Sequence, residues 1–308
     1  MIYSATGEEE IAQFEDSVKK KYSRRSFIKN SIRLFILAFL GLSFEGRDNI
    51  KVEHLKLRFS NLPYSFDDFK IVQISDLHAS FWVKSDYLLK VVKQINQLEK
   101  DLLVITGDFI TSSKDNLLTR WLPVKQKYIS IVIDVLANLK EGKKLAVLGN
   151  HDQWDGIKIE RHLVKELERI GFQVLRNRAL RLTRDGESIY VIGTDDFWFS
   201  CNLSQALRNV PNNAFKILIS HNPDITGDIQ EDMKIDLTLC GHTHGGQVAI
   251  PYLSQHFIPI KNPARYMAGL VREPYGYTYV NRGIGTLIFP LRFGAPPEIT
   301  YFTLNRLT

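Results

Sequence analysis

The sequence predicts an α/β fold in which helices cover sheets of buried strands. Short runs of four to six residues are apolar at nearly every position, and apolar residues recur at helical spacing between several of them. Of the 308 residues, 44% are hydrophobic and 24% charged, which allows a large core and argues against a disordered or fibrous chain. We therefore expect one folded domain, residues 50–308, after an N-terminal extension, residues 1–49.

The strand candidates are the nearly continuous apolar runs, which are typical of strands buried on both faces. They are Lys70–Ser75, Leu102–Thr106, Lys144–Leu148, Ile189–Ile192, Phe215–Ser220 and Ile235–Cys240, followed by an alternating strand at Ile299–Leu304. Helices are predicted at Ser85–Glu99 and Ile159–Ile170, with Ser85 as an N-cap and Gly171 as a stop.

The N-terminal extension combines a basic cluster with a short apolar run. Residues 19–33 contain no acidic residue and seven basic ones: Lys19, Lys20, Lys21, Arg24, Arg25, Lys29 and Arg33. The following run, Leu34–Phe44, has 11 residues, which is shorter than the roughly 20 that a spanning helix needs. We expect residues 19–44 to attach the chain to a membrane surface as an interfacial anchor. The alternative is a solvated basic run that leads into a core helix.

Within this extension, residues Ser23–Lys29 also resemble a twin-arginine export motif. However, 22 residues precede Ser23, and no cleavage site of small residues follows Phe44. Basic clusters stay on the cytoplasmic side of membranes. We therefore expect a peripheral or monotopic inner-membrane protein with a cytoplasmic domain, and export by the twin-arginine route is the alternative.

Polar residues follow the predicted strands in five blocks. The blocks are Asp76-Leu77-His78, Gly107-Asp108, Gly149-Asn150-His151-Asp152, Ser220-His221 and Gly241-His242-Thr243-His244. Folds of the α/β class bind ligands at the ends of their strands. Residues i and i+2 of an extended segment point the same way, so Asp76 with His78, and His242 with His244, can converge. Carboxylates, imidazoles and an amide oxygen suit Mn, Fe, Zn or Ni better than calcium.

These five blocks, in this order, resemble the signature of the calcineurin-like metallophosphoesterases. The resemblance implies a four-layered α/β/β/α sandwich that holds two divalent metal ions, with Mn²⁺ as our first choice. It implies a first-metal group of Asp76, His78 and His244, a second-metal group of Asn150, His221 and His242, and Asp108 as the bridge. His151 is implied as a catalytic group rather than a ligand, and we expect Asp152 to orient it.

Further segments resemble the bacterial membrane-associated branch of this family. They are Gly245-Gly246-Gln247, residues 281–285 and residues 290–299. The branch implies hydrolysis of UDP-2,3-diacylglucosamine to UMP and 2,3-diacylglucosamine 1-phosphate in lipid A biosynthesis. The alternative is an exported general phosphodiesterase or phosphatase that acts on soluble or cell-envelope substrates. A scaffold without activity is disfavoured because all eight site residues are present, and nucleic acid is not an expected partner because the basic cluster adjoins an apolar run.

Residues 247–294 are more apolar than a solvent loop needs. We expect part of this segment to form an apolar surface beside the metals for the acyl chains of a substrate. Four cations within it, Lys261, Arg265, Arg272 and Arg292, are expected to face a diphosphate. The alternative is ordinary core strands and surface loops.

Overall fold

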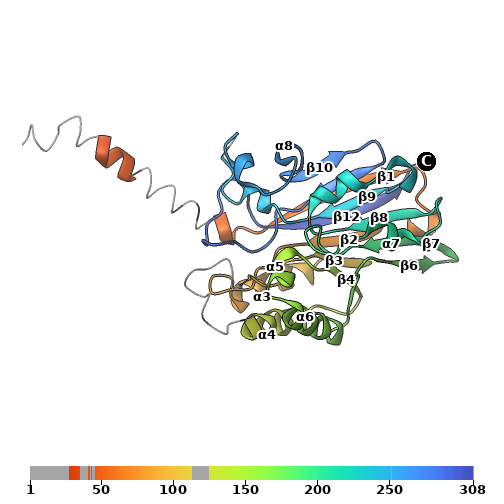
Figure 1. Cartoon of the computed structure of the whole chain (residues 1–308), viewed down its shortest axis with the longest axis horizontal. Coiled ribbons are helices and arrows are strands. Elements are labelled where there is room, and N and C mark those ends of the chain that lie inside the picture. The colour runs from red at the N-terminus through yellow and green to blue at the C-terminus, as the bar shows by residue number, and fades with distance from the viewer. Residues whose placement is uncertain are drawn as a thin grey trace, which may run out of the picture.

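The computed structural model describes residues 28–34, 41, 43, 46–112, 125–250 and 252–307. Two six-stranded sheets pack against each other, and helices cover their outer faces (Figure 1). The α/β/β/α sandwich predicted above is confirmed.

The first sheet has the strand order β1-β12-β2-β3-β4-β5. Its strands are β1 (Lys51–Phe59), β12 (Glu298–Arg306), β2 (Phe69–Ile74), β3 (Leu102–Thr106), β4 (Lys143–Val147) and β5 (Phe172–Val174). Strands β2 to β5 are parallel, whereas β12 is antiparallel to β2. Every residue of β3 is buried, as its continuous apolar sequence predicts.

The second sheet has the order β10-β11-β9-β8-β7-β6. Its strands are β10 (Gly269–Arg272), β11 (Tyr277–Val280), β9 (Leu237–Cys240), β8 (Phe215–Ile219), β7 (Glu187–Gly193) and β6 (Arg178–Arg184). Strands β11, β9, β8 and β7 are parallel, and the outer strands β10 and β6 are antiparallel to their neighbours.

Three apolar clusters hold the layers together. Helices α3 (Ser85–Ile95), α4 (Lys125–Leu136) and α6 (Ile157–Arg169) pack on the outer face of the first sheet. A second cluster joins the two sheets, with Val104 of β3 and Ile217 of β8 among its members. A thinner layer with α7 (Leu203–Leu207) and the 3₁₀ helix Pro223–Asp228 covers the second sheet.

Short helices lie near the strand ends and in the segment that follows β9. They are α5 (Asn150–Trp154), α8 (Pro263–Tyr266) and the 3₁₀ helices Tyr64–Phe66, Glu231–Met233, His244–Gly246 and Ser254–Phe257. The loops after β2, β3, β4, β8 and β9 carry the five polar blocks. Backbone hydrogen bonds connect these loops, so the blocks meet at one end of the sandwich.

The predicted strands all lie within one or two residues of observed strands, apart from the longer β7 and β12. Five strands (β1, β5, β6, β10 and β11), helix α4 and the short helices α5, α7 and α8 were not predicted. Lys84, and not Ser85, is the N-cap of α3, and no side chain caps it. Gly171 does follow the end of α6 and has a φ of 88°.

Most of the predicted membrane anchor, residues 19–44, lies outside the described residues. The twin-arginine-like motif Ser23–Lys29 also lies outside them, except for its last two residues. Residues 28–34 are helical and exposed. The chain contacts the body of the fold at Ser43, whose carbonyl oxygen accepts a hydrogen bond from the backbone of Arg292 at 2.9 Å. In the described part of the chain no helix has both the length and the hydropathy of a membrane span. The division at residue 49 stays a prediction.

Candidate active site

Sharp backbone turns bring the predicted ligands together. Five of the seven have a left-handed conformation with φ between 46° and 72°: Asp76, His78, Asp108, His242 and His244. This conformation costs a residue with a side chain about 1–2 kcal/mol, and it recurs at functional sites. Hydrogen bonds between loops hold it, because Asp76 N–H donates to Gly107 O at 2.9 Å and His78 N–H to Asp108 O at 3.0 Å. The blocks that contain Asp76, Asp108 and His242 are therefore turns rather than extended segments.

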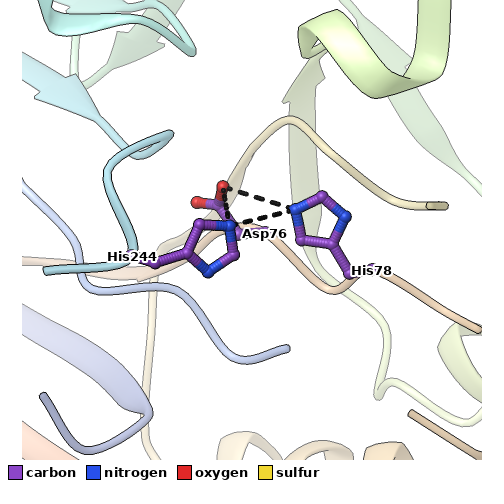
Figure 2. Close-up of side chains that lie close together, drawn as sticks. All are labelled: Asp76, His78 and His244. Carbon is purple, nitrogen blue, oxygen red and sulfur yellow. Dashed lines mark hydrogen bonds and ion pairs between the residues drawn. The ribbon is translucent and has the colours of Figure 1, made fainter. Parts of the chain in front are cut away.

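The first cluster consists of Asp76, His78 and His244, and Figure 2 shows the three side chains directed at one another. The two Nε2 atoms of His78 and His244 are 3.1 Å apart. An oxygen of Asp76 lies 3.3 Å from His244 Nε2 and 3.9 Å from His78 Nε2. All three side chains are buried, so the cluster is a compact set of one oxygen and two nitrogen donors.

The second cluster consists of Asn150, His221 and His242. His221 Nε2 lies 3.1 Å from Asn150 Oδ1 and 3.2 Å from His242 Nδ1. Asp108 lies between the two clusters, because its Oδ2 is 3.3 Å from His78 Nε2 and 3.1 Å from His221 Nε2. The structure thus brings all seven sequence-predicted ligands together. His242 and His244 belong to different clusters, so the expectation that they converge on one point is wrong.

The donor atoms fit cations. His221 Nδ1 is 2.7 Å from the carbonyl oxygen of Thr106, to which it donates its hydrogen. The lone pair of a neutral His221 is then on Nε2, where it faces the oxygens of Asn150 and Asp108. The lone pairs of these acceptor atoms repel one another unless a proton or a metal ion lies between them. This arrangement matches two divalent ions held by mixed oxygen and nitrogen ligands.

The charges around His221 favour a positive charge at its position. Burial opposes its protonation, but the carboxylates of Asp108, Asp76 and Asp196 outweigh burial and raise the pKa of His221 to about 10. Burial, with the positive charge of His221, lowers the pKa of His242 to about 3. A positive charge at this position, from a proton on His221 or from a bound cation, is therefore favoured by the surrounding carboxylates.

Metal affinity should rise with pH for this reason. Binding at the second cluster must displace the His221 proton, so between pH 6 and 8 the affinity should increase about tenfold per pH unit. Titration calorimetry with Mn²⁺ in two buffers of different ionisation enthalpy should show release of about one proton per chain. An affinity that does not change over this pH range would contradict the assignment of His221.

Two glycines allow the loops to approach each other this closely. Gly107 has a φ of 95°, and a Cβ atom there would lie 2.6 Å from Gly149 N and 2.8 Å from His221 Nδ1. A Cβ atom on Gly149 would collide with the carboxylate of Asp108. Both positions therefore require glycine if Asp108 is to lie between the clusters.

Asp152 acts on the backbone and not on His151. Its buried carboxylate accepts hydrogen bonds from the backbone N–H groups of Asp108, Phe109, Ile110 and Gly149 at 2.9–3.3 Å. The expectation that it orients the imidazole of His151 is wrong, because these four bonds tie the loop after β3 to the start of α5. Asp152 is thus a positioning residue for Asp108 and Asn150.

His151 lies at the wall of the site. Its backbone N–H donates to Asp108 Oδ1 at 2.9 Å, and its Nε2 is 3.9 Å from Asp108 Oδ2. The ring also packs edge-on against His78, with centroids 4.7 Å apart. Its distance from the clusters is compatible with a group that contacts substrate, and that role stays a prediction.

Replacing His151 by alanine should lower kcat by about 10²- to 10⁴-fold while both metals remain bound, as expected for loss of a proton donor. The exposed His162 on α6 offers the matched control, and His162→Ala should retain activity. Elemental analysis of the purified variants separates the two possible roles. Loss of metal from His151→Ala would identify it as a ligand instead.

Sequence reasoning missed three residues near the clusters. Asp196 follows β7, is buried, and contributes to the electrostatic field at His221; burial raises the pKa of Asp196 itself to about 6. Trp154 packs on His151 with centroids 4.5 Å apart, and Trp198 packs on His242 at 4.8 Å. The block Gly193-Thr194-Asp195-Asp196 follows a strand as the other five do, so the same pattern could have indicated Asp196.

A cavity of about 510 Å³ opens against both clusters. His151, His242 and His244 form part of its wall. The other walls are mostly apolar, with contributions from Trp154, Trp198, Val248, Ile250, Leu253, Phe257, Ile258, Leu287, Ile288 and Phe289. The predicted apolar surface within residues 247–294 therefore lies beside the clusters.

Two of the four cations predicted to face a diphosphate have other partners. Arg292 is fully buried and donates to the carbonyl oxygens of Gly285, Ala295 and Arg282 at 2.6–3.1 Å. Arg265 pairs with Glu273 at 2.7 Å. For these two the expectation is wrong, because backbone carbonyls and a carboxylate already satisfy their guanidinium groups.

Comparisons with known proteins agree with this geometry. Residues 69–246 match the family described as calcineurin-like phosphoesterase. A metallophosphoesterase of Bacillus subtilis (strain 168), YkuE, is 33% identical over 297 residues, which cover 93% of this chain and 99% of YkuE. The phosphodiesterase YaeI of Escherichia coli is 32% identical over 240 residues, which cover 77% of this chain and 82% of YaeI.

A third relative is the UDP-2,3-diacylglucosamine pyrophosphatase LpxG of Chlamydia trachomatis. It is 27% identical over 303 residues, which cover 78% of this chain and 85% of LpxG. With this family match and these relatives, the chain belongs to the calcineurin-like phosphoesterases and is a metal-dependent hydrolase.

Proposed function

We propose that this hydrolase cleaves the diphosphate of an acylated nucleotide sugar at a membrane surface. The specific reaction is hydrolysis of UDP-2,3-diacylglucosamine to UMP and 2,3-diacylglucosamine 1-phosphate. The apolar cavity that opens directly against the metal-binding clusters carries the proposal, because a water-soluble phosphodiester needs no such wall. The pyrophosphatase activity for which LpxG is named is consistent with it.

The clusters would hold two divalent ions, with Asp108 shared between them. Such ions supply Lewis acidity at the phosphoryl oxygens and a water nucleophile of lowered pKa. The residues of the chain keep this arrangement in place. Thr106 fixes the His221 tautomer through its carbonyl oxygen, and Asp152 fixes the loop that carries Asp108.

His151 would hold a proton for the leaving phosphate. Its imidazole lines the cavity beside Asp108 and is only 5% exposed, so bulk water does not compete strongly for that proton. Trp154 and Trp198 line the same cavity, with ring planes 18° apart and centroids 6.1 Å apart. An aromatic face of this kind stacks favourably on a nucleobase, which fits the uracil of the proposed substrate.

The acyl chains would bind along the apolar wall. Each buried methylene contributes about 0.8 kcal/mol, so four of them give about 3 kcal/mol, or roughly 100-fold in kcat/KM. Purified protein with Mn²⁺ should therefore hydrolyse UDP-2,3-diacylglucosamine at least about 100-fold more efficiently than unacylated UDP-glucosamine. Release of UMP measures both rates. Equal efficiency on the two would exclude a role for the cavity in acyl recognition.

A second candidate is an exported phosphodiesterase that acts on soluble or cell-envelope substrates. The twin-arginine-like sequence Ser23–Lys29 favours export, and the similarity to the phosphodiesterase YaeI favours a phosphodiester substrate. The same assay distinguishes the two candidates when a chromogenic phosphodiester is included. Good turnover of that diester without turnover of the acylated compound would favour the second candidate.

The membrane location is part of the proposal. The basic residues between 19 and 33 and the apolar run 34–44 would attach the protein by two different forces. Deletion of residues 1–49 should release most of the protein from membranes, whereas high salt should release the full-length protein only in part, because salt does not screen apolar contacts. Complete release by salt would leave electrostatic attraction as the sole attachment.

A further inference from the structure

The mouth of the cavity is bordered by exposed apolar side chains, which we call the mouth rim. The rim consists of Leu253, Phe257, Ile288 and Phe289, which line the cavity, and of Tyr252, which precedes Leu253 in the chain. Their exposed fractions are 49%, 77%, 58%, 63% and 87%, respectively. Isolated exposed apolar residues are common, but four of them on the wall of one opening, with Tyr252 next to them in the chain, indicate an interaction surface.

The two segments that form the rim are held together. Gln247 binds residues 287–289 through its side chain, because Nε2 donates to Leu287 O at 3.0 Å and Oε1 accepts from Leu287 N–H at 2.7 Å. Next to this pair, Ala249 N–H donates to Phe293 O at 2.7 Å. The rim is thus a fixed surface made from both sides of the cavity mouth.

We propose that the mouth rim inserts into the surface of a lipid bilayer, so that the cavity opens toward the membrane. The N-terminal segment meets the fold at this place. Ser43, at the end of the basic and apolar extension, accepts a hydrogen bond from Arg292, three residues after Phe289. Figure 1 shows this entry point beside the C-terminal loops, at the end of the sandwich where the polar blocks lie.

Charge and geometry both favour a bilayer as the occupant. The extension has seven basic residues and no acidic one between residues 19 and 33, which is attractive to anionic lipid headgroups. Attachment at Ser43 keeps the rim close to that surface. The proposed lipid substrate gives a reason for this membrane contact. The contact itself does not depend on that substrate, because it needs no hydrolysis.

Depth-dependent fluorescence tests the orientation directly. Full-length Phe257→Trp is bound to phosphatidylcholine–phosphatidylglycerol vesicles that contain lipids brominated in their acyl chains. The added tryptophan should be strongly quenched relative to the wild type. Tyr64→Trp is the matched control, because Tyr64 is 72% exposed and precedes β2, at the opposite end of the first sheet. Equal quenching at both positions, or none at Phe257→Trp, would overturn the proposal.

Vesicle flotation at high salt supplies a second measurement, because salt weakens the contribution of the basic segment. The triple variant Tyr252→Ser, Phe257→Ser, Phe289→Ser should partition at least about tenfold more weakly than the wild type. Tyr64→Ser should partition as the wild type does. Unchanged partition of the triple variant overturns the proposal, provided that its circular dichroism and metal content match the wild type.

Two further outcomes separate this surface from other roles. If the rim instead joins two copies of the chain, the wild type forms dimers without lipid and the triple variant does not, which overturns the proposal. If vesicle contact occurs but UDP-2,3-diacylglucosamine is not hydrolysed, the proposed substrate fails while the membrane contact of the rim is supported.

Discussion

Replacing Asp108 by asparagine should reduce phosphoester hydrolysis by about 10⁴-fold or more, equivalent to about 5 kcal/mol of transition-state stabilisation. Its Oδ2 lies within 3.3 Å of a histidine nitrogen from each cluster, so one carboxylate serves both positions. Asparagine keeps the shape of the side chain and tolerates the left-handed φ of 55°. Loss of activity is then due to loss of charge between the clusters.

The fold should survive this change, because the interactions of Asp152 with the backbone of the loop remain. Steady-state assays with a chromogenic phosphodiester and circular dichroism together test the prediction. Asp134→Asn, at an exposed position on α4, is the control and should retain full activity. Activity of Asp108→Asn within tenfold of the wild type would mean that the two clusters do not share a carboxylate.

Replacing Arg292 by methionine should lower the free energy of unfolding by about 3–5 kcal/mol. This guanidinium is fully buried, and among the described residues its hydrogen-bond partners include no carboxylate. It instead donates hydrogen bonds to carbonyl oxygens of the loops around Gly285 and Ala295, which would lose their donors inside the protein. Methionine fills much of the volume but donates no hydrogen bond.

Urea denaturation of wild type and variant, both with saturating Mn²⁺, measures the effect. Arg272→Met is the control, since Arg272 is exposed on β10 and should change stability by less than about 0.5 kcal/mol. Equal stability of Arg292→Met and wild type would show that water can satisfy these carbonyl groups. The role of Arg292 would then have to be sought in catalysis.

The sequence alone was sufficient to predict the central strands and to identify the residues that form the two clusters. Runs such as Leu102–Thr106 are apolar because both faces of the strand are buried, and parallel strands bring their final residues to one edge. The partly exposed strand β6 was missed, because polar residues interrupt its sequence and leave no continuous apolar run. The polar residues Arg178, Arg181, Thr183 and Arg184 of this outer strand are exposed, and its apolar residues are only partly buried.

The geometry at the clusters could not be predicted from local sequence. An extended backbone would direct His242 and His244 to one point, whereas their left-handed conformations direct them to two clusters. That conformation depends on bonds to distant loops, such as the hydrogen bonds from His242 N–H to Asp76. The burial of Arg292 likewise depends on long-range packing, because a basic residue in an aromatic segment is normally expected at the surface.

The central claim is that two metal ions share Asp108 in one hydrolytic site. Elemental analysis of the full-length protein reconstituted with Mn²⁺, combined with electron paramagnetic resonance, tests it most directly. We predict two Mn²⁺ ions per chain with an exchange-coupled spectrum, and loss of that coupling in Asp108→Asn. A fully active protein that binds a single Mn²⁺ ion, with the spectrum of an isolated ion, would contradict this account.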